Sequence, residues 1–164
     1  MLKWFNEKKT EVLKSEKPHT IIKCDITSTY IKVLKENEVF VFGSNLQGIH
    51  SGGAARIARE CFGAIMGQGV GLQGQSYAIP TMQGGVKTIK PYVDEFIKFA
   101  QIHTEFHFLV TRIGCGIAGF RDADIAPLFE NAINLSNISL PKEFIDILTC
   151  CSTLSILVLK IKND

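Results

Sequence analysis

The stretch TRIGCGIAGF, Thr111 to Phe120, follows the apolar run Phe106 to Val110 and precedes a segment, 122–135, with a helical pattern. Its glycines at 114, 116 and 119 leave no side chain to keep a ligand away from the backbone. A helix N-terminus also presents unpaired N–H groups, which suit an anion. The stretch therefore predicts a phosphate-binding turn between a strand and a helix.

A second unit of the same kind lies upstream, in EVFVFGSN (38–45) and the glycine-rich segment that follows it. The apolar run Val39 to Phe42 predicts a central strand, and the pattern turns helical near Gly53. In an open α/β sheet, ligands bind beyond the carboxyl ends of the strands. Because both glycine loops follow such ends, after Phe42 and after Val110, we expect them to border one crevice.

The rest of the chain alternates between strand and helix patterns. Strands are predicted in TIIKCDI (20–26), SYAIPT (76–81) and EFHFLV (105–110), and helices in 28–35, 89–103 and 122–135. The alternation predicts an α/β domain with a mixed or mostly parallel sheet covered on both faces.

Three further segments carry weaker signals. GQGVGLQGQ (67–75) predicts a mobile or tightly turned loop, or a plain connector. Residues 1–17 are expected to form an N-terminal arm or a peripheral helix, which leaves 18–164 as a single domain. LTCCSTLSILVLK (148–160) predicts a packed terminal strand or helix, with a role at a membrane surface or a partner as the alternative, since it is shorter than a bilayer span of about 20 residues.

Composition narrows the function classes. Among 164 residues, 18 are basic and 16 acidic, so the net charge of +2 lacks the basic excess typical of nucleic-acid binding. The five cysteines form no CxxC pair, and the charged N-terminus does not resemble a secretory signal, so we expect reduced thiols and a cytoplasmic protein that does not enter a membrane. His19, His103 and His107 have no metal-ligand spacing, and neither a metal nor a cofactor is expected.

The spelling GxGxxG at 114–119 leaves three interpretations open. A Rossmann-type dinucleotide site would place this turn in the first strand–helix unit with an acidic residue about 20 positions later, where Glu143 is only a loose candidate. A tight turn without a ligand is the second interpretation. The third comes from a resemblance that other segments support.

Four segments occur in the order of the macro domain motifs: IIKCDITS (21–28), VFVFGSN (39–45), HSGGAARIA (50–58) and TRIGCGIAGF (111–120). The chain resembles that family, which implies a three-layer α/β/α domain with a mixed central sheet and binding of ADP-ribose or a related NAD-derived nucleotide. The resemblance implies that Asp25 and Ile26 bind the adenine, although Cys24 stands where the family has glycine. The alternative for Asp25 is an N-cap of the helix predicted at 28–35.

The same resemblance assigns the remaining ligand contacts. Asn45, Gly52 and Gly53 would lie beside the distal ribose, and the amides of a longer run would hold the diphosphate: Gly114, Cys115, Gly116, Ile117, Ala118 and Gly119. Phe120 resembles the aromatic that packs on the ligand's ribose or base, with a core phenylalanine as the alternative. Asp122 and Asp124 are interpreted as capping or dipole partners of the helix that follows.

Catalysis is less supported than binding. RIGCGIAG is similar to the RIGCGL loop of a macro branch that removes ADP-ribose from acidic side chains, but that branch's lysine and Asp positions are Met82 and Ala118 here. The aspartate that another branch carries in its glycine loop falls among Ala54, Ala55 and Arg56. His50, with Asn45 and a bound water, is the remaining candidate for a hydrolase. We therefore expect a reader or sequestering module for the nucleotide or an ADP-ribosylated macromolecule, with hydrolysis and a purely structural role as alternatives.

Overall fold

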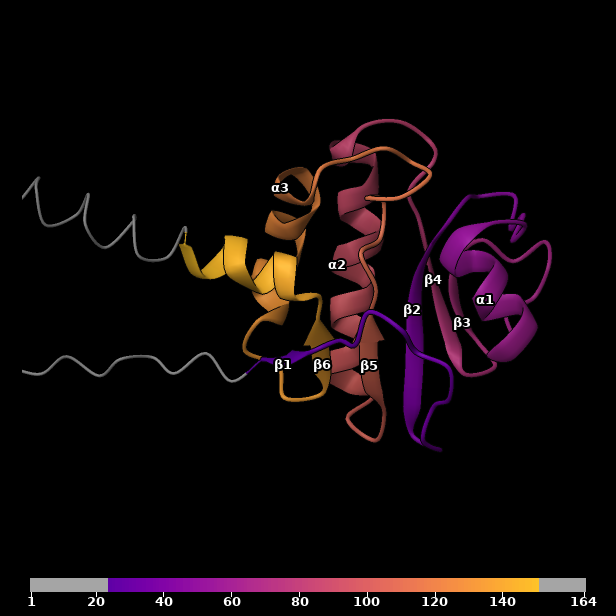
Figure 1. Ribbon diagram of the computed structural model, residues 1–164, viewed down its shortest axis with the longest axis horizontal. Helices are drawn as coiled ribbons and strands as arrows, with labels where there is room; N and C mark the ends of the chain where they lie inside the picture. The colour runs from indigo at the N-terminus through magenta and orange to yellow at the C-terminus, as the bar shows by residue number, and fades with distance from the viewer. Residues whose placement is uncertain (1–23, 151–164) are drawn as a thin grey trace, which may run out of the picture.

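The structure is a computed structural model that describes residues 24–150 (Figure 1). The arm predicted at 1–17, the beginning of the strand predicted at 20–26 and most of the segment 148–160 lie outside the described residues.

A six-stranded sheet organises the described chain. Its strands are β1 (Asp25–Ile26), β2 (Glu38–Ser44), β3 (Gly71–Gln73), β4 (Ser76–Pro80), β5 (His107–Val110) and β6 (Ile138–Leu140). They lie in the order β1-β6-β5-β2-β4-β3, and only the edge strand β3 is antiparallel to its neighbour. The predicted α/β class with a mixed, mostly parallel sheet is confirmed.

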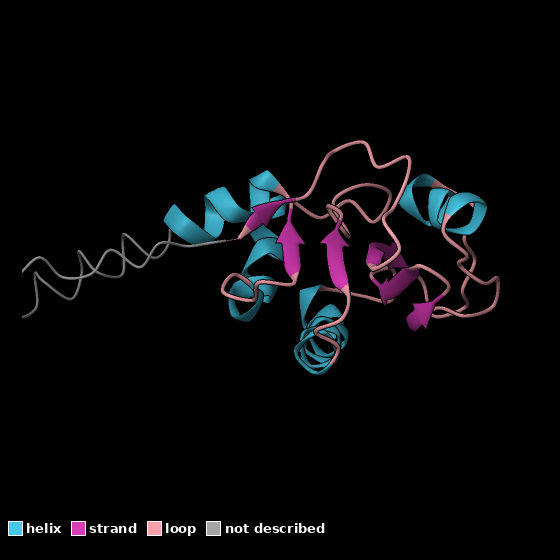
Figure 2. Ribbon diagram, turned by 90° about the horizontal axis from the view of Figure 1, so that it is seen from below, coloured by secondary structure: helices cyan, strands magenta, loops and turns pink. Residues whose placement is uncertain are grey.

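Helices cover both faces of the sheet, as Figure 2 shows. They are α1 (Gly53–Cys61), α2 (Val86–Ile102), the single turn α3 (Asp122–Ile125), the 3₁₀ helix η1 (Ala126–Ala132) and residues 142–150. Side chains of β2 alternate between two cores: Phe40 and Phe42 pack with α1, and Val39 and Val41 pack with α2 and η1. This double burial explains why the central strand is a continuous apolar run.

The helix predicted at 28–35 is absent, so that prediction was wrong. The chain leaves β1 at its carboxyl end and must cross two intervening strands to reach the start of the parallel strand β2. Eight helical residues would advance only about 12 Å, whereas extended chain covers about twice that length. Ile31 and Leu34 still pack beside the Phe40 core, while Tyr30 and Val33 are exposed.

Two other predictions needed revision, and one strand was missed. The helix expected over 122–135 begins at Asp122 as predicted, but it tightens into η1, whose first turn contains Pro127, a residue without an N–H for the α-helical pattern. The loop 67–75 contains β3, and Gly67 N–H donates to Gly48 O at 3.0 Å. The strand β6 was not predicted either, and both missed strands, β3 and β6, are only three residues long.

Candidate functional site

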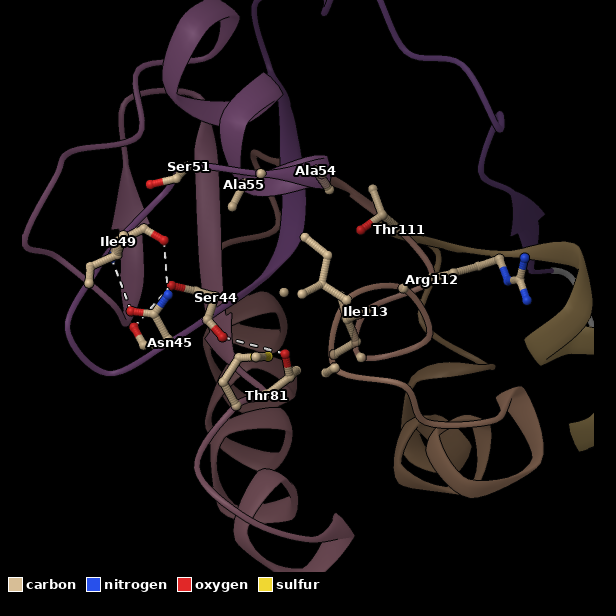
Figure 3. Close-up of a pocket in the computed structure, with 18 residues that line it drawn as sticks. Ser44, Asn45, Ile49, Ser51, Ala54, Ala55, Thr81, Thr111, Arg112 and Ile113 are labelled. Atoms are coloured by element: carbon tan, nitrogen blue, oxygen red, sulfur yellow. Dashed lines mark hydrogen bonds between the residues drawn. The ribbon is translucent and has the colours of Figure 1, made fainter.

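The loops after β2 and β5 meet at one cavity. The two strands pair with Val41 opposite Val110, so their carboxyl ends lie side by side, and Thr111 donates from both its N–H and its Oγ1 to Val41 O. The cavity has a volume of about 350 Å³, and both glycine loops contribute to its wall (Figure 3). The two loops therefore border one crevice, as their positions after the strands predicted.

The loop after β5 presents unpaired backbone donors to this cavity. Its internal turns use the N–H groups of Cys115, Gly119 and Phe120, which donate to Arg112 O, Gly116 O and Gly114 O. Within residues 24–150, no hydrogen-bond partner is found for a second set of amides, all from residues that line the cavity: Gly114, Gly116, Ile117 and Ala118. Unpaired N–H groups at a concave surface suit an anion.

The N-terminus of α1 supplies a second set of donors at the same cavity. Gly52 is its N-cap, makes no side-chain cap and accepts the Arg56 N–H at 3.2 Å. The N–H groups of Gly53, Ala54 and Ala55 come too early in the helix for a partner, and all three residues line the cavity. The N-terminus of α1, the positive end of its dipole, thus lies at the same cavity as the donors of the loop after β5.

The glycines of the two loops differ in how much space a Cβ atom would have. A Cβ added to Gly116 would meet no atom within 4 Å, so the cavity is open at this position. A Cβ on Gly52 would lie 3.1 Å from the Ile117 side chain, which reaches across from the other loop although it is 75% exposed. The two loops therefore approach each other above the cavity.

Among the side chains lining the cavity, only that of Arg112 is titratable. Its Nε and Nη2 donate to the two carboxylate oxygens of Asp122 at 2.9 and 2.6 Å. This pairing raises the pKa of Arg112 and lowers the pKa of Asp122. Figure 3 shows the guanidinium directed away from the cavity. The wall consequently offers backbone donors, uncharged polar side chains and apolar side chains, with no free acid or base.

Asn45 lines the cavity, but its side chain already holds a loop together. Nδ2 donates to Ile49 O at 2.9 Å, and Oδ1 accepts from Ile49 N–H at 3.0 Å. Thr81 is also occupied, because its hydroxyl donates to Ser44 O at 3.4 Å. These side chains shape the wall rather than present free donors to a ligand.

His50 does not line the cavity. Its side chain is fully buried, with Nε2 at 3.1 Å from Ser44 Oγ and the ring edge-on to Phe42 at 5.1 Å. Burial lowers the pKa of this imidazole, so the ring is neutral at pH 7. The expectation that His50 faces the distal ribose disagrees with this position, since no ligand atom can reach a fully buried ring.

Comparisons with models of known protein families, with curated proteins and with solved structures found no match.

The remaining predicted ligand residues fall outside this cavity. Cys115, Gly119 and Phe120 do not line it, and half-buried Phe120 packs against the larger core, as its core alternative predicted. Burial and the nearby Asp122 carboxylate raise the pKa of Cys115 to about 12, so its thiol stays protonated. Asp124 accepts from the Arg121 N–H at 3.3 Å, a capping contact of the kind expected.

Asp25 and Ile26 are exposed on β1, at the edge of the sheet to which β5 and β2 also direct their carboxyl ends. Neither residue lines this cavity or the second cavity described below. No helix follows for Asp25 to cap, so that alternative was wrong.

A second cavity of about 590 Å³ lies beside the first and shares Gly53, Ala54 and Thr111 with it. Its wall is largely apolar and consists of Ser28, Thr29, Tyr30, Ile31, Lys32, Phe40, Ile57 and Cys61 besides the shared residues. Sequence reasoning missed this groove because it treated 28–35 as a helix. The one available signal was an aromatic, Tyr30, in a polar stretch.

Within residues 24–150, no group of three His, Cys, Asp or Glu side chains lies close enough together to hold a metal ion. None of the helices in that range is both long and apolar enough to span a bilayer.

Proposed function

We propose that this protein binds ADP-ribose or a related NAD-derived nucleotide as a macro-like domain of three α/β/α layers. The diphosphate lies in the first cavity between two sets of unpaired N–H groups, at Gly114–Ala118 and at the N-terminus of α1. That convergence of donors is the observation that carries the proposal. Backbone donors bind an anion without a formal cation, in agreement with the net charge of +2.

The nucleoside lies in the second cavity, which continues from the first past Gly53 and Thr111. Its exposed aromatic, Tyr30, and its aliphatic wall at Ile31 and Ile57 offer a purine base an apolar contact surface. Asp25 comes three residues before this wall, on the same edge of the sheet. Asp25 is the carboxylate that we expect to recognise the adenine.

Binding without hydrolysis is the activity that the site supports. Hydrolysis of a glycosidic linkage needs a positioned base or nucleophile and assistance to the leaving group. The cavity lacks a free acid or base, His50 is buried and Asn45 is engaged with Ile49. We therefore propose a reader or sequestering module, for the free nucleotide or an ADP-ribosylated macromolecule.

Calorimetry with ADP-ribose and AMP tests the proposal. ADP-ribose should bind far more tightly than AMP, and Gly116→Glu should weaken ADP-ribose about 100-fold, because a side chain and a like charge then occupy the place of the anion. Gly85→Glu is the matched control, since a Cβ at Gly85 also meets no atom within 4 Å. Equal affinities for ADP-ribose and AMP, or an unchanged affinity in Gly116→Glu, would remove the loop from the site.

A reader and a hydrolase differ when an ADP-ribosylated protein is the substrate. The wild-type protein should retain ADP-ribosylated protein without releasing ADP-ribose from acid, serine or arginine linkages. If the wild-type protein released ADP-ribose and His50→Ala abolished this release, the result would support the hydrolase alternative instead.

A further inference from the structure

Arg112 lies in the wall of the first cavity, but its guanidinium is paired with carboxylates outside the cavity. Besides the two hydrogen bonds to Asp122, its Nη1 lies 3.9 Å from Glu143. The guanidinium contacts these carboxylates and is directed away from the cavity (Figure 3). Asp122 begins α3, at the far end of the loop after β5, so the ion pair joins the two ends of this loop.

The local charge count beside the loop is negative. One guanidinium faces the two carboxylates of Asp122 and Glu143, and the nearby thiol of Cys115 is neutral. The next cation along the chain, Arg121, is itself paired with Asp124 at 2.8 Å. No carboxylate lines the cavity, so none is placed there to hold a divalent cation against the ligand.

We propose that Asp122 determines which diphosphates the site accepts, by holding Arg112 out of the cavity. The site then binds diphosphates that are esterified at both ends and disfavours those that end in a free phosphate. This inference rests on the proposed function, because it concerns the ligand of the same cavity.

The physical reason is charge. A terminal phosphate loses a second proton with a pKa of about 6, so at pH 8 it carries one more negative charge than its ester. Neutral N–H groups can solvate a diphosphate diester, but an additional charge beside two carboxylates lacks a partner. The cavity also continues on both sides of the donors, toward the second cavity and toward Ile49 and Met82. This shape leaves room for a substituent at each end.

ADP and its β-methyl ester provide a matched test, since they differ by one methyl group and one charge. At pH 8 without divalent cations, we expect the wild-type protein to bind the ester about tenfold more tightly than ADP. Asp122→Asn frees Arg112 to reach the terminal phosphate and should bring the ratio of the two dissociation constants close to one. The double variant Asp122→Asn, Arg112→Gln should restore the ratio.

The restoration separates this role from a merely structural one, because damage to the loop would not be repaired by removing Arg112 as well. Asp94→Asn breaks the exposed Lys90–Asp94 pair on α2 and should leave the ratio unchanged. A ratio that is the same in the wild type and in Asp122→Asn, or one that the double variant does not restore, overturns the proposal. If wild type binds neither the ester nor ADP-ribose, the proposed function itself fails.

A pH series on the wild-type protein needs no variant. As the pH falls from 8 to about 5, the terminal phosphate of ADP takes up its second proton, so the ratio should approach one. A ratio that stays constant over this range contradicts the proposal.

Discussion

His50 shows how one residue can matter for folding although it cannot touch a ligand. Its Nε2 contacts Ser44 Oγ, at the carboxyl end of β2, and its Nδ1 has no hydrogen-bond partner within residues 24–150. Burial lowers the pKa of the folded imidazole below the ordinary value of 6.5. The ring therefore packs as a neutral group beneath the loop that leads to α1.

We predict that this residue makes the fold sensitive to acid. Above pH 6.5 the ring is neutral in both the folded and the unfolded state. Below pH 6.5 the unfolded chain binds a proton that the folded chain does not bind, so the free energy of unfolding decreases as the pH decreases. The fall ends once the pH passes the lowered folded pKa. The contribution is at most about 1.4 kcal/mol per pH unit.

Denaturant unfolding of wild type and His50→Gln at pH 8, 6.5 and 5 measures this contribution. The variant should be less stable at pH 8, because it loses the ring contact with Phe42, and the difference should narrow toward pH 5. Parallel pH profiles would show that His50 does not titrate as proposed.

At the scale of elements, the sequence predicts those whose pattern is long and uninterrupted. β2, β4, β5 and α2 follow from apolar runs or a helical stripe, and α1 from the small residues after Gly53. The edge strand β3 could not be predicted, because two glycines frame it and its pairing depends on β4. The segment 28–35 has a short helical pattern, but the crossing from β1 to β2 requires extended chain.

The loop between β2 and α1 depends on a close backbone approach by another loop. A Cβ on Gly69 would lie 2.1 Å from Asn45 O and 2.8 Å from Leu46 O, both backbone atoms that cannot rotate away. We predict that Gly69→Ala lowers the free energy of unfolding by about 3 kcal/mol, because the two loops must separate.

Gly116→Ala is the control for this effect, since its Cβ meets nothing within 4 Å and its φ is not positive. Denaturant unfolding should show little change in this control. A Gly69→Ala protein as stable as wild type would mean that the loops are not held at this distance.

At the scale of the molecule, the sequence predicted where the cavity forms better than which side chains line it. Glycine loops after two central strands indicated the crevice, because parallel strands direct their carboxyl ends to one edge. The Arg112–Asp122 pair was not predicted: Asp122 has the position of a helix-capping residue, and its partner lies ten residues earlier on the other side of the loop. Side-chain direction depends on packing, which also explains why His50, in a glycine loop, is buried.

The charge distribution of the whole molecule leads to a last prediction, on salt. A site that binds phosphates through several lysines or arginines releases counterions, so its affinity falls steeply as salt rises. Here the proposed anion donors are backbone N–H groups, the one cation in the wall is paired with Asp122, and the net charge is only +2. Between about 0.05 and 0.5 M NaCl, ADP-ribose affinity should therefore change less than about threefold.

Calorimetry across that salt range checks the prediction, and Asp122→Asn supplies the contrast. Once released from Asp122, Arg112 becomes a free cation beside the ligand, so the variant's affinity for ADP-ribose should fall more steeply with salt than that of the wild type. A steep fall in the wild-type protein would mean that charged side chains, rather than the amides around Gly116, provide most of the attraction. The two slopes together thus distinguish an amide-lined anion site from a cationic one.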